Sequence, residues 1–196
     1  MVLQWDKEWA LQYLIKQPSK RLPHGLLEDR AHKRHQKVVD YETGQMVGCR
    51  RWILPDHLTG EWLEAQTPAV SSDEEEEYAE SPGNADCEYG AVLDTLGVPV
   101  VSLKKRLMGR EGYMGGLPFS PSACSGHDIV TLLVESGIAQ AEEMGVDIFV
   151  LAFKVATGVY HQLGFEMLGQ FVPDDSKYGG KSEYGTYFLG KVGKRL

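Results

Sequence analysis

Residues 155–171 read VATGVYHQLGFEMLGQF, which predicts a short helix that turns directly into a strand. The helix is expected over 155–163 and the strand over 165–171, with Leu163-Gly164-Phe165 at the junction. Tyr160 lies on the predicted helix, one turn before the glycine. No other part of the chain has a pattern as specific as this helix–glycine–strand unit.

The residues before this unit predict a long helix and a buried strand. Residues 128–144 repeat apolar side chains at helical spacing, and Gly145 follows as a stop signal. The apolar face comprises Ile129, Leu132, Leu133, Gly137, Ala141 and Met144. The run IFVLA at 148–152 is short and rich in branched residues, which favours a strand buried on both faces. With a last strand at 183–191, the C-terminal order is α–β–α–β–loop–β and contains a crossover unit.

A hairpin is predicted nearer the N-terminus. Two β-rich runs, 36–41 and 45–54, are separated by Glu42-Thr43-Gly44. A short loop with a glycine placed for a positive φ is a hairpin signal. Pro55 is expected to stop the second strand.

The other segments are predicted to add little to the sheet. A helix over 4–16 is expected to stop near Pro18, within a helical N-terminal segment at 1–35. Residues 56–87 are rich in Pro, Ser, Gly, Asn and Glu, and indicate an acidic mobile loop insertion. The whole chain, 1–196, is predicted to be a single domain.

The middle of the chain gives weaker patterns. A short helix is predicted over 101–108. The glycine-rich segment GREGYMGG at 109–116 favours a turn, because no phosphate-binding motif accompanies it. Two prolines make PFSPSA, 118–123, a poor strand.

The composition excludes several classes of protein. The chain is 42% hydrophobic and 24% charged, as is ordinary for a globular protein, and its net charge of −8 argues against a general nucleic-acid binder. No apolar run approaches the ~20 residues of a membrane span, and no signal peptide is evident, so a cytoplasmic location is expected. Reduced thiols are expected for Cys49, Cys87 and Cys124. No metal site is predicted from His24, His32 and His35, since no i,i+4 pair comes with an acidic partner.

From about residue 36 to the end, the element order resembles the Gcn5-related N-acetyltransferase (GNAT) superfamily. The likeness rests on GVYHQLGF at 158–165 and on AEEMG at 141–145 with the strand after it. The hairpin VVDYETG–QMVGCRRWILP is similar to the second and third strands of fungal members. The resemblance implies an α+β (α/β three-layer) fold, with a GNAT-like mixed, mostly antiparallel twisted sheet flanked by helices. It also implies two central parallel strands that splay apart to admit the pantetheine arm of acetyl-CoA.

The resemblance further implies roles for individual residues. A tyrosine in the helix before Leu-Gly-Phe often protonates the leaving thiolate, and Tyr160 falls at this position. A packed, half-buried aromatic is its alternative role. His127 is the second candidate catalytic residue. The pyrophosphate would rest on N–H groups at the start of the long helix. That places the cofactor beside Ser125, Gly126, His127, Ile129 and Val130.

The chain departs from the family in this phosphate loop. The family pattern is Q/R-x-x-G-x-G/A, and Asp128 and Val130 stand where the two glycines are expected. A carboxylate beside a pyrophosphate is repulsive, and a branched Cβ obstructs close approach of the backbone. Acetyl-CoA is therefore implied by the resemblance and opposed by these two residues.

Three functions stay open. The first is an acetyl-CoA-dependent N-acetyltransferase of a small-molecule amine, with a divergent cofactor loop. The second is a GNAT fold in specialised metabolism that has lost acetyl-CoA and binds, cyclises or rearranges a small hydrophobic metabolite. The third is a non-catalytic binding module whose acidic loop meets a partner. A homodimer is possible, and neither nucleic acid nor membrane is an expected partner. The candidate substrate-binding residues are Trp52, Trp62, Phe119, Asp128, Phe153 and His161.

Overall fold

The computed structural model describes residues 8–80, 98–106, 113–119, 127–174, 176 and 185–193. Its strands are β1 (Lys33–Val39), β2 (Met46–Ile53), β3 (Tyr113–Phe119), β4 (Asp147–Phe153), β5 (Glu166–Phe171) and β6 (Thr186–Lys191). Its helices are α1 (Glu8–Leu27), α2 (Ser72–Glu80), α4 (His127–Met144) and α5 (Thr157–Gln162), and residues 98–106 are also helical. None of the helices within these ranges combines the length and apolar character needed to cross a bilayer.

The strands form one six-stranded sheet in the order β1-β2-β3-β4-β6-β5. Among the described strands, β3 and β4 are the one parallel pair of neighbours, and the other neighbours are antiparallel. β6 lies between β4 and β5, so the β4–α5–β5 connection crosses over one strand. This arrangement confirms the α+β fold with a GNAT-like, mostly antiparallel sheet. It also confirms the hairpin, the long helix and the order of the C-terminal elements.

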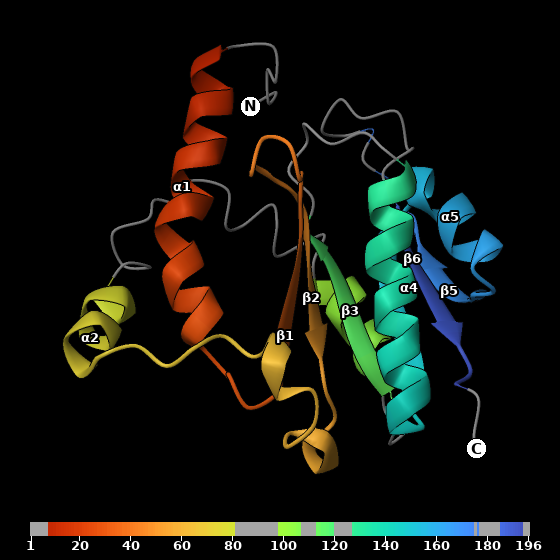
Figure 1. Ribbon diagram of the computed structural model, residues 1–196. Coiled ribbons are helices and arrows are strands. Elements are labelled where there is room, and N and C mark those ends of the chain that lie inside the picture. The colour runs from red at the N-terminus through yellow and green to blue at the C-terminus, as the bar shows by residue number, and fades with distance from the viewer. Residues whose placement is uncertain are drawn as a thin grey trace.

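Helix α4 lies across one face of the sheet, and α5 stands beside β5 and β6 (Figure 1). Helix α1 stands at the β1 end. The face toward α4 carries alternate residues of β2, namely Gly48, Arg50 and Trp52, which are buried. On α4 the buried positions include Leu133, Val134 and Ala141, whereas Leu132, predicted on the buried face, is 55% exposed.

Trp52 is at the centre of this core. Its ring is fully buried, and a Cβ added to Gly137 of α4 or to Gly116 of β3 would collide with it. The indole Nε1 donates to Gln36 Oε1 on β1 at 2.7 Å, and Gln36 donates in turn to Ser136 Oγ of α4. Trp52 therefore joins two strands and the long helix through one buried side chain.

The N-terminal helix is longer than predicted. It continues past Pro18 and Pro23 to Leu27, although the sequence predicted an end near the first proline. A proline removes one backbone N–H and can kink a helix without ending it. β1 then begins at Lys33, so residues 33–35 belong to the sheet rather than to the helical segment.

The acidic segment is also more regular than the predicted loop. It contains the 3-10 helices Asp56–Leu58 and Leu63–Ala65, and the acidic run lies in α2. Ser71 and Glu74 form a reciprocal cap: Ser71 N donates to Glu74 Oε2 at 3.0 Å, and Glu74 N donates to Ser71 Oγ at 3.4 Å. Such a capping box satisfies two N–H groups of the first turn, and carboxylates there favour helix formation. Residues 81–87 of the predicted loop lie outside the described residues.

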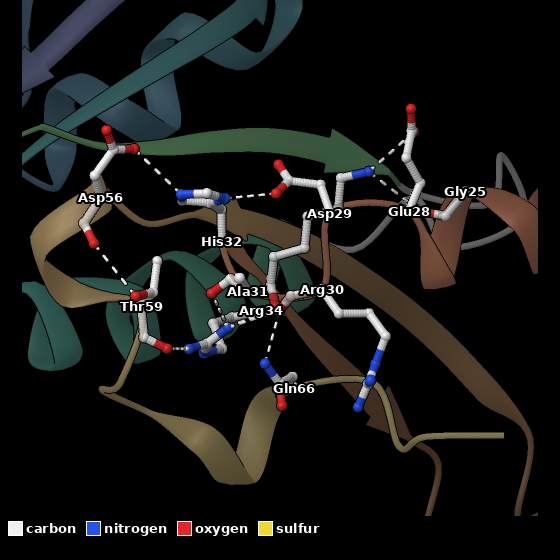
Figure 2. Close-up of polar contacts among 11 residues, drawn as sticks. Gly25, Glu28, Asp29, Arg30, Ala31, His32, Arg34, Asp56, Thr59 and Gln66 are labelled. Carbon is white, nitrogen blue, oxygen red and sulfur yellow. Dashed lines mark hydrogen bonds and ion pairs between the residues drawn. The ribbon is translucent and has the colours of Figure 1, made fainter.

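Arg34 fixes the start of this segment against β1 (Figure 2). The residue is fully buried, and its guanidinium donates to backbone carbonyls of two separate segments, 30–33 and 59–61. Two acceptors, Thr59 and Glu61, follow the first 3-10 helix, at 2.8 Å each from Nη2. The others are the carbonyl oxygens of Arg30, Ala31 and Lys33. Burial holds the pKa of Arg34 below its usual value, and Glu64 partly opposes this.

β3 occupies residues for which a turn and a poor strand were predicted. Gly116 lies in the middle of the sheet, and Pro118 is paired with Arg50 of β2. The proline fits because pairing with β4 ends at Gly116, so at Pro118 the described strands pair with β3 on one side only, through β2. Gly116 fits because a side chain there would meet Arg50 Nη2 and the Trp52 ring, both at 2.6 Å.

Candidate functional site

The parallel strands β3 and β4 separate part-way along their length. They are paired from Tyr113 with Asp147 to Gly116 with Val150, and no later pair joins them. β3 nevertheless continues to Phe119 along β2, and β4 continues to Phe153 along β6. This splay of the central strands is the one that the resemblance implies.

Tyr160 lies on α5 beside this region. It is 1% exposed, and its ring meets Phe165 edge-on at a centroid distance of 5.4 Å. Its hydroxyl accepts a hydrogen bond from Arg50 Nη1 at 3.0 Å. Because the arginine donates, the phenolic proton is still available to another acceptor. The placement fits both predicted roles, a proton donor and a packed aromatic.

Arg50 is a further residue of this site, and no sequence motif marks it. It is 3% exposed on β2, and its guanidinium carbon lies 4.2 Å from the centroid of the Trp52 ring and 5.7 Å from that of Tyr160. The two rings partly compensate its charge by cation–π attraction. A signal was present: Gly48, Arg50 and Trp52 are at alternate positions of a strand, so they share one face.

The start of α4 carries the predicted phosphate-binding residues. Ser125 and Gly126 lie outside the described residues. His127 and Asp128 open the helix, but their side chains lie outside the described part. Ile129 packs over Gly48, and Val130 packs against the core.

The predicted substrate-binding residues are dispersed. Trp52 is fully buried in the core and Trp62 packs against the core, whereas Phe153 is 51% exposed at the end of β4. The His161 ring bonds the Phe165 carbonyl through Nδ1 at 3.0 Å, so it closes the turn after α5. Phe119 pairs with Cys49 through its backbone, and its side chain lies outside the described part.

No metal centre emerges from the described part of the chain, where no three His, Cys, Asp or Glu residues gather closely enough to hold an ion. His32 is instead bound to two carboxylates, Asp29 at 2.5 Å and Asp56 at 3.2 Å (Figure 2). The hydrogen bond to Asp29 is the main cause that raises the pKa of His32, with Asp56 adding to it and burial opposing it. Burial raises the pKa of the Cys49 thiol, so that thiol is not activated.

No protein-family model matches the chain, and no curated protein matches its sequence. Solved structures of several acetyltransferases are similar to it. A GCN5-related N-acetyltransferase from Kribbella flavida is 13% identical, with a TM-score of 0.43, over 82% of this chain and 67% of that one. An acetyltransferase of the GNAT family from Streptococcus pneumoniae is 10% identical, with a TM-score of 0.44, over 98% and 79%.

A ribosomal-protein-alanine N-acetyltransferase from Brucella melitensis is 14% identical, with a TM-score of 0.44, over 93% of this chain and 78% of that one. At such identities and TM-scores, neither an activity nor a substrate carries over from these proteins. The chain's own topology, with its single splayed parallel pair among the described strands, is that of a GNAT-like α+β fold.

Proposed function

We propose that this chain transfers an acetyl group from acetyl-CoA to the amine of a small molecule. The observation that carries the proposal is the splay of β3 and β4 beyond Gly116 and Val150, with the Tyr160 hydroxyl held beside it by Arg50. In this reaction the amine nitrogen attacks the thioester carbonyl carbon, and the carbon–sulfur bond breaks. The amine loses a proton to solvent, and the leaving thiolate takes one from Tyr160.

Three parts of the chain would each have a separate role in this reaction. The first N–H groups of α4, at 127–130, have no partner within the helix and would donate hydrogen bonds to the phosphates of the cofactor. Tyr160 would supply the proton. Arg50 would stabilise the phenolate that remains, because its positive charge is 3.0 Å from the oxygen.

Three measurements test this proposal. Acetyl-CoA at millimolar concentration is expected to raise the Tm, because a ligand that binds the native state stabilises it. Tyr160→Phe is expected to lower turnover, followed as thiol release on a panel of amines, by roughly 10²-fold or more. The affinity of Tyr160→Phe for acetyl-CoA should stay within about twofold of the wild-type value, since the phosphates would bind at the start of α4 and Tyr160 lies on α5.

Tyr41→Phe is the matched control, because Tyr41 is fully exposed in the hairpin turn. Its turnover should equal that of the wild type. Absence of any Tm shift at millimolar acetyl-CoA would reject the proposal. Normal turnover of Tyr160→Phe would leave transfer possible but remove Tyr160 from the acid role.

The second candidate is a GNAT-like fold that takes a different small molecule in place of acetyl-CoA. The observation that favours it is the burial of the Tyr160 hydroxyl under a charged side chain, since Tyr160 and Arg50 are 1% and 3% exposed. A protein with this function should melt at the same temperature with and without acetyl-CoA.

A further inference from the structure

Arg50 carries a buried edge that meets no hydrogen-bond partner in the described part of the chain. Of its nitrogens, Nη1 bonds Tyr160, whereas Nε and Nη2 are buried and have no partner among the described residues. No described carboxylate forms an ion pair with it. Removing a guanidinium from water without an anion is costly, so a group from outside these contacts is expected to meet this edge.

Arg34 shows how the same fold satisfies an arginine that has only a structural role. It lies on the neighbouring strand β1, opposite Trp52, and is also fully buried. Its Nε, Nη1 and Nη2 all donate to backbone carbonyls, at 2.8 to 3.3 Å. Among the described residues, Arg50 has one hydrogen-bond partner, and that partner is the hydroxyl of the proposed proton donor.

The chemistry of the free edge selects the ligand. Nε and Nη2 are adjacent on one side of the planar guanidinium, and their N–H bonds form the fork that matches the two oxygens of a carboxylate. The Trp52 and Tyr160 rings flank the guanidinium, and Gly116 leaves room for Nη2 against β3. A small apolar body attached to the carboxylate would suit such aromatic neighbours.

We propose that the Nε–Nη2 edge of Arg50 binds the carboxylate of a small-molecule ligand next to Tyr160. Binding of the carboxylate does not depend on acetyl transfer. The further step, that this ligand is the acyl acceptor and therefore an amine that also bears a carboxylate, rests on the proposed function.

The test titrates the full chain, labelled with ¹⁵N at arginine Nε, with sodium acetate at constant ionic strength set by sodium chloride. The Nε–H signal of Arg50, assigned by its loss in Arg50→Lys, should shift and saturate. The signal of Arg34 should not move, because its donors are already satisfied. Acetate tenfold above its Kd should also raise the Tm by about 3–6 °C.

Two probes and two variants sharpen the result. Acetamide has the shape of acetate without its charge and should have no effect, and inorganic phosphate should shift the signal less than acetate does. Arg50→Gln should melt at or above the wild-type temperature in acetate-free buffer and lose the acetate effect, because it removes an uncompensated buried charge. Lys37→Gln, which removes an exposed positive charge from β1, should keep the acetate effect.

Several outcomes would overturn the proposal. The first is an Arg50 signal that stays fixed up to about 200 mM acetate, because a specific site would bind far more tightly than that. The second is an equal response to acetate and acetamide. The third is a response to phosphate as strong as the response to acetate. If Arg50→Gln fails to fold, the wild-type titration still decides. A Tm shift with acetyl-CoA but no response to acetate would refute the carboxylate site and leave the proposed function intact. A response to acetate but no Tm shift with acetyl-CoA would refute the proposed function alone.

Discussion

Trp52 fills a space that Gly137 and Gly116 leave open. The packing at the centre of the core therefore depends on the two glycines, which have no side chain, as much as on the Trp52 ring. Mid-helix glycine is unfavourable by about 1 kcal/mol relative to alanine, so Gly137 needs a reason of this kind. The ring cannot move aside easily, because it is fully buried and its Nε1 bonds Gln36.

Gly137→Ala is expected to lower the free energy of unfolding by about 1–3 kcal/mol, because the new Cβ would lie 1.9 Å from Trp52 Cζ2. Urea unfolding followed by tryptophan fluorescence measures the loss. Gly158→Ala in α5 is the matched control, since nothing lies within 4 Å of its added Cβ. It should be neutral or stabilising by up to about 1 kcal/mol. Equal effects of the two substitutions would contradict the packing explanation.

The site was only partly predictable at this scale. The helix–glycine–strand pattern placed Tyr160 correctly in the fold, because that pattern depends on local sequence. Arg50 was missed because a charged residue in a strand is usually solvated, and its burial depends on Tyr160 and Trp52 together. The sequence did place Arg50 and Trp52 on one face of β2, and that alternation was the usable signal.

At the scale of the elements, short-range patterns predicted the hairpin, α4, β4 and the strands after α5. β3 could not be predicted in this way. Its glycine and proline oppose strand formation locally, and they are accepted because of long-range contacts: Arg50 and Trp52 over Gly116, and the loss of β4 as a neighbour at Pro118. A residue without an N–H cannot add a bond toward β4, so Pro118 agrees with the splay.

Arg34 makes a further prediction about how elements are joined. Arg34→Lys is expected to lower the free energy of unfolding by about 3 kcal/mol or more, because an ammonium group has three donors and cannot reach five carbonyls. Denaturant unfolding gives the total loss, and faster amide exchange at 59–62 should locate it. Arg30→Lys is the comparison, since Arg30 makes one such bond, to Thr67 at 2.9 Å, and should cost about 1 kcal/mol. Similar losses in both variants would show that the carbonyl network has no special weight.

At the scale of the whole molecule, two histidines near the start of β1 set the pH dependence of stability in opposite directions. Burial first, and then the charges of Arg51 and Lys33, lower the pKa of His35 to about 4. Between pH 4 and 6.5, His35 is therefore protonated in the unfolded chain and neutral in the folded protein. The free energy of unfolding falls as the pH is lowered through this window. The raised pKa of His32 acts above pH 6.5: its contribution is complete below that pH and is lost as the pH rises through the folded value.

Stability is consequently expected to peak near the unperturbed pKa of histidine, about 6.5. Urea midpoints at pH 4.5, 5.5, 6.5 and 7.5 would show it, compared with two variants so that the titration of carboxylates cancels. His35→Gln should flatten the acid side, where a single proton gives a slope of at most about 1.4 kcal/mol per pH unit. His32→Gln should flatten the alkaline side, whereas His57→Gln, an exposed control, should reproduce the wild-type curve. If the acid slope persists in His35→Gln, another group causes it. That result would contradict the inference that burial keeps His35 neutral in the folded protein.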